Sequence, residues 1–94
     1  MSKRARASVV IRHAVGLHAR PSVKLTKLAK GFASKIDLGL SAEGPWIDAK
    51  SIVKVMATRA PKDSMIFFRA EGADADVAVQ ALVTLVEGDF EDGH

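Results

Sequence analysis

A histidine between a glycine, an arginine and a proline is the part of this sequence best suited to chemistry. Gly16 allows a sharp turn before His18, and Pro21 fits a first helical turn, where its missing N–H group is not needed. The first N–H groups of a helix have no intrahelical partners, and together with the helix dipole they form an anion site. Such a site disfavours the protonated imidazole and stabilises a phosphoryl group attached to it. The pattern predicts a phosphoryl acceptor at His18.

Arg20 adds a second functional group to this segment. Its planar guanidinium is suited to bind the oxygens of a phosphoryl group on His18. The same residues also fit a simpler interpretation, in which His18 caps a helix and Pro21 is an ordinary first-turn proline. Residue types and spacing alone leave both interpretations open, because short motifs recur by chance.

The helix that would position His18 is predicted over residues 19–30, and Gly31 is a good stop signal at its end. Its apolar residues fall mostly on one side, and its lysines fall largely on the other. The apolar set is Val23, Leu25, Leu28 and Ala29, and the basic set is Lys24, Lys27 and Lys30.

Alternating or β-branched segments predict four strands, at about residues 7–11, 35–40, 46–48 and 65–68. Ser51 is expected to cap a short helix over residues 52–58. Asp74 is expected to be the N-cap of a last helix, with an acidic tail after residue 87 that frays. The apolar face of this last helix is predicted to comprise Val77, Ala78, Ala81, Leu82, Leu85 and Val86.

The predicted order is β-α-β-β-α-β-α, which indicates an α/β (α+β) open-faced sandwich. Its four-stranded, mainly antiparallel sheet would be covered on one face by three helices. We expect a single domain over residues 1–94, with a core at about residues 5–88 and an acidic C-terminal tail at residues 89–94.

Residues 16–21, Gly-Leu-His-Ala-Arg-Pro, resemble the active-site signature of the HPr family, the histidine-containing phosphocarriers of the bacterial phosphotransferase system. Residues 29–32, 48–52 and 70–72 resemble further segments of that family, in the family's order. The resemblance covers about residues 5–88 and implies the same sheet and three helices. It also implies that enzyme I phosphorylates His18 on Nδ1, that Arg20 assists, and that an enzyme IIA-type domain is the acceptor.

Ser51 matches the family's regulatory serine, which a dedicated kinase, the HPr kinase/phosphorylase, phosphorylates in some bacteria. A plain helix cap explains the same residue. The resemblance therefore leaves open a regulatory binding protein switched at Ser51 as the alternative to a phosphocarrier. Departures from the sugar-transport branch include Val15 before the signature and Arg59 after the short helix. They lean toward the nitrogen-related branch or toward a divergent HPr from a proteobacterium.

The resemblance also implies a docking surface at the start of the short helix, formed by Ile52, Val53 and Met56. We expect Ile52 and Val53 to be partly exposed, because a helix of two turns cannot bury all of its apolar residues. Lys24 and Lys27 share the first helix with His18 and are expected to steer an acidic partner toward it.

Composition excludes several other functions. The 94 residues include no cysteine, which removes disulfides and thiolate chemistry, and His13 with His18 makes a poor zinc site. The net charge of +3 is too small to indicate nucleic-acid binding, and no apolar run indicates a signal peptide or membrane span. We expect a cytoplasmic monomeric carrier, rather than an enzyme, with no metal or cofactor. A general-base enzyme is disfavoured because no acid–base partners surround His18.

Overall fold

A four-stranded antiparallel sheet forms one layer of the molecule in a computed structural model, which describes residues 3–12, 16–17 and 19–90. The strands are β1 (Lys3–Val10), β2 (Lys35–Gly39), β3 (Trp46–Asp48) and β4 (Met65–Gly72). Their spatial order is β1-β4-β2-β3. The central strand β4 pairs antiparallel with β1 on one side and with β2 on the other, and β3 completes the sheet beside β2.

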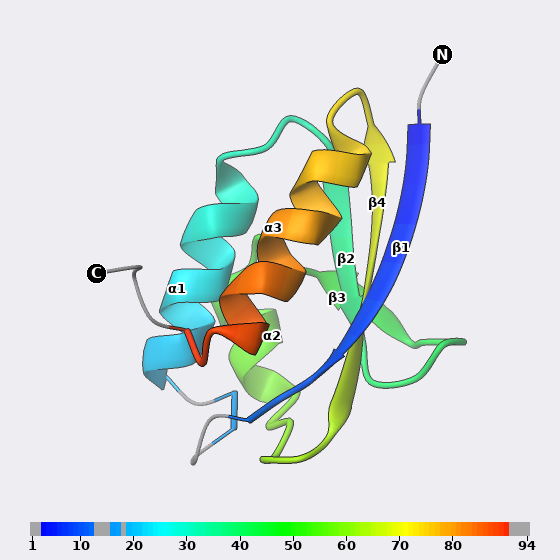
Figure 1. Cartoon of the computed structure of the whole chain (residues 1–94). Helices are drawn as coiled ribbons and strands as arrows, with labels where there is room; N and C mark the ends of the chain where they lie inside the picture. Colours follow the sequence, from blue (N-terminus) through cyan, green and yellow to red (C-terminus); the bar gives the residue numbers. More distant parts are fainter. Residues whose placement is uncertain (1–2, 13–15, 18, 91–94) are drawn as a thin grey trace.

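Three helices form the second layer: α1 (Ala19–Lys30), α2 (Ile52–Ala57) and α3 (Ala75–Glu87). They lie on one face of the sheet (Figure 1). The helix α3 packs against β1 and β4, and α1 packs against both α2 and α3. The predicted open-faced sandwich and its element order are confirmed. No helix within the described residues is both long enough and apolar enough to cross a membrane.

Alternation along the strands separates the two faces of the sheet. Ile66, Phe68 and Ala70 of β4 point to the helices and are buried, as are Ile36 and Leu38 of β2. The residues between them point to the uncovered face, because successive side chains of a strand alternate. The core therefore lies between the sheet and the helices, where burial of these apolar side chains stabilises the fold.

Two strands are longer than their sequence patterns indicate. β1 begins at Lys3 and ends at Val10, where residues 7–11 were expected, and β4 continues to Gly72. The reason is their mutual pairing, which runs from Lys3 opposite Gly72 to Val10 opposite Met65. In contrast, β2 is shorter than predicted. It ends at Gly39, so Leu40 lies outside the strand and is 47% exposed.

The helices also differ from the predicted faces. In α1 the buried positions are Pro21, Ser22, Leu25, Thr26 and Ala29, so Val23 lies outside the apolar face and is 51% exposed. In α3 the buried stripe follows residues 75, 78, 79, 82 and 86. Val77 falls outside this stripe and is 63% exposed, contrary to the prediction.

Residues at the ends of α3 make long-range contacts that local signals do not reveal. Asp74 precedes the helix, but its side chain makes no cap hydrogen bond there. Its carboxylate instead accepts hydrogen bonds from the backbone N–H groups of Ala33 and Ser34, at 2.9 Å each, and from the Ser34 hydroxyl. Beyond the helix, Phe90 is only 3% exposed, so its side chain packs with the core although the sequence pattern places it in the acidic tail. Residues 91–94 of that tail lie outside the described residues.

Candidate functional site

The candidate phosphoryl acceptor, His18, lies outside the described residues, as do His13 and Val15. The residues on both sides of His18 are described, and we call Gly16, Leu17 and the first turn of α1 the frame of the site. Leu17 precedes it, and Ala19 begins α1. The geometry of the site is therefore built from this turn, from the first helical turn and from the neighbouring helix α2.

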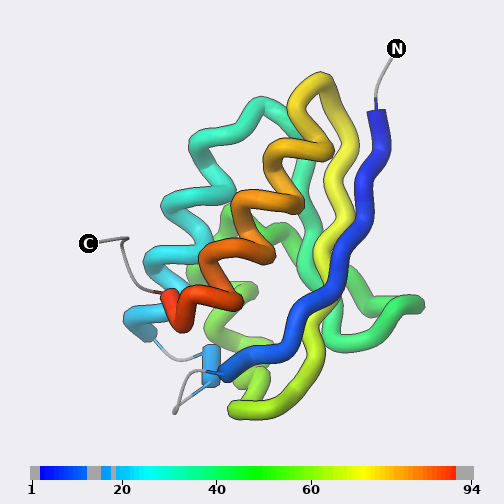
Figure 2. The backbone as a smooth tube through the Cα atoms, in the orientation of Figure 1, coloured from blue at the N-terminus to red at the C-terminus, as the bar shows by residue number. Residues whose placement is uncertain are grey.

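A tight contact anchors the turn before His18. The backbone N–H group of Leu17 donates a hydrogen bond of 2.8 Å to the carbonyl oxygen of Ala60, and the Leu17 side chain is buried. Gly16 has a φ of +66°, and a Cβ atom there would lie 2.3 Å from the same carbonyl oxygen. Only glycine fits this position, because a side chain would meet backbone and the dihedral angle disfavours other residues. The turn is thus attached to the loop that follows α2, and Figure 2 shows the two segments at the same end of the molecule.

The first turn of α1 is suited to an anion. Arg20 is exposed and Pro21 is buried, so the charged side chain points to solvent while the proline packs inward. The turn contains no acidic residue. Unpaired N–H groups at a helix start carry a partial positive charge, and here no carboxylate of the same turn competes for them.

Ser51 caps α2, as the sequence indicates. Its Oγ accepts a hydrogen bond of 3.3 Å from the backbone N–H group of Lys54. The predicted helix end at residue 58 agrees closely with the structure, in which α2 ends at Ala57 and Thr58 is its C-cap. The cap accounts for the presence of a serine at this position.

Apolar side chains are exposed on two adjacent helices. On α2, Val53 is 74% exposed, Met56 is 39% exposed and Ile52 is half-buried. On α1, Val23 is 51% exposed. The sequence analysis assigned Val23 to the buried face and so did not include it in the exposed apolar surface. Its position three residues after the exposed Arg20 could have indicated exposure, because residues three apart lie on the same face of a helix. Since α1 packs against α2, these residues belong to neighbouring elements.

The two lysines expected to steer a partner differ in their surroundings. Lys27 is exposed. Lys24 is half-buried, and its Nζ donates a hydrogen bond of 2.7 Å to the carbonyl oxygen of Phe90. This bond joins α1 to the segment after α3. The ammonium group of Lys24 is thus a structural donor to the backbone.

No group of three or more histidine or acidic side chains within the described residues is arranged to hold a metal ion. Trp46 is half-buried on β3, and its ring lies beneath two arginines. The described frame therefore offers a turn, a helix start and an adjacent apolar surface.

Comparison with known proteins shows which family this chain resembles. Residues 5–88 match the family model of the HPr component phosphorylation site of the phosphotransferase system. The phosphocarrier protein HPr of Cupriavidus necator is 40% identical over 80 residues, which cover 85% of this chain and 88% of that protein. The multiphosphoryl transfer protein of Vibrio cholerae is 38% identical over 88 residues, which cover 93% of this chain and 22% of that much longer protein.

A solved structure agrees in fold. The crystal structure of an HPr protein from Thermoanaerobacter tengcongensis superposes with a TM-score of 0.83 at 31% sequence identity, covering 92% of this chain and 94% of that one. With its family signature, its relatives and its fold in agreement, the chain belongs to the HPr family and is a phosphocarrier of the phosphotransferase system.

Proposed function

We propose that His18 is the residue that carries the phosphoryl group, which it accepts on Nδ1 from enzyme I and passes to an enzyme IIA-type domain. The observation that carries this proposal is the frame around His18. Gly16 and Leu17 are attached to the Ala60 carbonyl on one side, and α1 begins at Ala19 on the other. These described residues bracket the N-terminal end of α1, where an anion is stabilised.

The frame supports transfer in both directions. The imidazole lone pair attacks phosphorus while the bond from phosphorus to the donor breaks, so the phosphoryl group moves without net hydrolysis. N–H groups at the start of α1 and the Arg20 guanidinium stabilise the charge on the phosphoryl oxygens. A nucleophile of the acceptor domain then attacks the phosphorus, the bond from Nδ1 of His18 to phosphorus breaks, and the chain returns to its starting form. This makes it a carrier in a transfer sequence and not a turnover enzyme.

Partner recognition is assigned to the exposed apolar residues beside this frame. Val53, Met56 and the partly buried Ile52 on α2 would contact the donor and the acceptor in turn. Exposed Lys27 and Arg20 on α1 would attract acidic partners, which raises the rate of encounter. Small apolar patches with charged rims suit partners that bind briefly. The regulatory role of Ser51 stays a prediction, which a search for phosphoserine at residue 51 in the purified protein would test.

The central test is phosphoryl transfer to His18→Ala, with His13→Ala as the matched control. Each protein is incubated with enzyme I and labelled phosphoenolpyruvate. We expect an acid-labile, base-stable adduct on the wild type and on His13→Ala, and none on His18→Ala. Circular dichroism should show the same fold for all three. Wild-type labelling of His18→Ala would contradict the assignment.

A further inference from the structure

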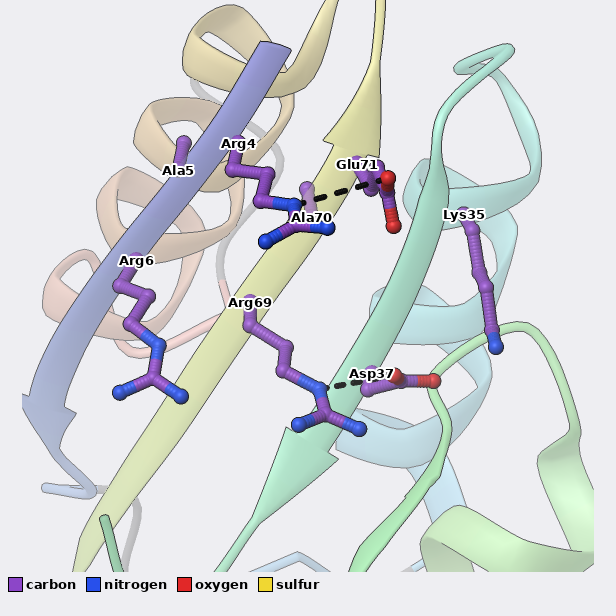
Figure 3. Close-up of a pocket in the computed structure, with 8 residues that line it drawn as sticks. All are labelled: Arg4, Ala5, Arg6, Lys35, Asp37, Arg69, Ala70 and Glu71. Atoms are coloured by element: carbon purple, nitrogen blue, oxygen red, sulfur yellow. Dashed lines mark hydrogen bonds and ion pairs between the residues drawn. The ribbon is translucent and has the colours of Figure 1, made fainter. Parts of the chain in front are cut away.

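The uncovered face of the sheet carries a basic hollow that the carrier function does not use. Its volume is about 510 Å³, and Arg4 and Arg6 of β1, Lys35 of β2 and Arg69 of β4 line it. Two carboxylates, Asp37 and Glu71, line it as well. Figure 3 shows these side chains projecting from three neighbouring strands on one face. The four cations exceed the two anions, so the hollow attracts negative charge.

The two carboxylates pair with only two of the four cations. Arg69 donates through Nε to Asp37 at 2.9 Å, and Arg4 pairs through Nε with Glu71 at a distance of 3.5 Å. Within the described residues, neither Arg6 nor Lys35 has a carboxylate partner.

Arg6 lies directly opposite Arg69 in the pairing of β1 with β4. Like charges in directly opposed positions destabilise a sheet unless an anion lies between them. An anionic ligand would remove this repulsion.

Trp46 holds these arginines in place. Its ring packs against Gly39, where a Cβ atom would lie only 3.1 Å from the ring. Glycine at this position therefore allows the close approach of the ring. The ring centroid is 4.3 Å from the guanidinium carbon of Arg69 and 5.6 Å from that of Arg6. Stacking of this kind limits the motion of both guanidinium groups, so less entropy is lost when a ligand binds them.

A second, smaller hollow adjoins the basic one and shares Arg6 with it. Its volume is about 180 Å³, and its wall is mostly apolar. The aromatic side chains that face this hollow are Trp46 and Phe67, whereas the ring of Phe68 points to the core on the other face of the sheet. A cationic hollow joined to an aromatic one suits a ligand with a phosphate group at one end and a ring at the other.

We propose that this face binds a phosphate ester of a small ring compound, of which a nucleoside diphosphate is the representative. The terminal N–H groups of Arg4, Arg6 and Arg69 would donate to the phosphate oxygens, and Trp46 with Phe67 would contact the ring. The site lies on the opposite face of the sheet from the helices. It is near the start of β1, whereas His18 follows the end of that strand. Both sites can therefore be occupied at once.

The test is a titration of the isotope-labelled full chain, followed by its amide and indole NMR signals. The probes are ADP, pyrophosphate and adenosine. We expect ADP to shift the Trp46 indole signal and amide signals of β1 and β4, with weaker shifts from pyrophosphate and from adenosine, because each probe fills one hollow.

Two double variants separate specific binding from net charge. Arg4→Gln/Arg6→Gln removes two guanidinium groups from the hollow, and Lys30→Gln/Lys62→Gln removes the same charge from exposed positions elsewhere. We expect the first to weaken ADP binding about tenfold or more, as the loss of charge-assisted hydrogen bonds predicts, and the second to change it little.

Three outcomes would overturn the proposal. The first is the absence of shifts on β1 and β4 in the wild type at millimolar ADP. The second is equal weakening by the two double variants, which would indicate general charge attraction. The third is confinement of the ADP shifts to the start of α1, which would place the anion at the carrier site. Phosphoryl transfer to His18 is measured separately, so failure here leaves the carrier assignment intact.

Discussion

Gly16 and Arg20 show how single residues prepare the carrier site for phosphate chemistry. The backbone at Gly16 passes so close to Ala60 that any side chain would collide with the carbonyl oxygen. This contact holds the turn before His18. Arg20 has the opposite character, since it is exposed and free of packing demands. The packing of the fold therefore does not require an arginine here, and we propose that its role is to contact the phosphoryl group.

Substitution of Arg20 should separate these roles. We expect Arg20→Ala to keep the fold and to slow phosphoryl transfer by about one to two orders of magnitude, the scale for loss of one donor to developing charge. Arg20→Lys should restore only part of the rate, because an ammonium group cannot form the planar fork. Transfer kinetics with enzyme I measure both effects. Lys30→Ala, which removes an exposed cation at the other end of α1, serves as the control. Equal slowing of transfer by both variants would show that Arg20 has no specific role at the site.

At the scale of elements, the packing of α1 against α2 brings the helix start and the exposed apolar residues together. The helix α2 has only six residues, and Val55 is its buried residue. A helix this short needs its Ser51 cap and its packing, because helices of this length do not persist alone in water. Its remaining apolar side chains are exposed or half-buried, and we propose that they contact other proteins.

Val53 is the best residue for testing this surface, because it is more exposed than Ile52 and contributes little to the core. We expect Val53→Glu to raise the Michaelis constant for this protein as a substrate of enzyme I by about tenfold, since a charge would enter an apolar contact. The melting temperature should stay near that of the wild type.

Val77→Glu is the matched control, since Val77 is similarly exposed at 63% but lies on α3. It should leave the Michaelis constant unchanged. Equal effects of the two substitutions would show that the contact does not involve α2.

At the scale of the whole molecule, Asp74 joins parts of the chain that are forty residues apart. Its carboxylate holds the loop between α1 and β2 against the start of α3. Hydrogen bonds from the Ser34 hydroxyl, and then from the backbone of Ala33 and Ser34, lower the pKa of Asp74 below its ordinary value of 3.8. A lowered pKa means that the folded state favours the charged carboxylate. The contribution to stability is therefore complete above pH 3.8 and is lost as the pH falls through the lowered value.

Asp74→Asn should reveal this contribution. At about pH 7 we expect the variant to be less stable than the wild type, because an amide nitrogen cannot accept the bonds that the second carboxylate oxygen accepts. The difference should shrink as the pH falls through the lowered pKa of Asp74, where the wild type also loses its charge. Urea unfolding at neutral pH and at a series of acid pH values measures it. Asp76→Asn removes the same charge from the first turn of α3 and controls for the interaction of a carboxylate with the helix dipole. If the loss of stability in Asp74→Asn did not depend on pH, the proposed link between the Asp74 charge and stability would be contradicted.

Phe90 makes a second whole-molecule contact. Its side chain is buried with the core although acidic residues surround it in the sequence, and its carbonyl oxygen accepts from Lys24. The acidic composition of the sequence around residue 90 would by itself indicate a solvent-exposed tail. The buried ring therefore depends on where α3 ends relative to α1, which no local pattern specifies.

Local signals were sufficient for the elements nearest the site. Pro21 and Gly31 delimit α1, and Ser51 marks the start of α2, because the signals for helix ends involve residues only a few positions apart. The order of elements and the family signature around His18 are also properties of the sequence. These determined the fold class and the carrier function.

Tertiary structure decided what depends on pairing between distant segments. The length of β1 follows from its register with β4, and the exposure of Val23 follows from how α1 meets two other helices. The partner of Asp74 and the basic hollow on the uncovered face arise from residues more than thirty positions apart. Sequence patterns describe neighbours along the chain, whereas these contacts are set by which elements pack together in space.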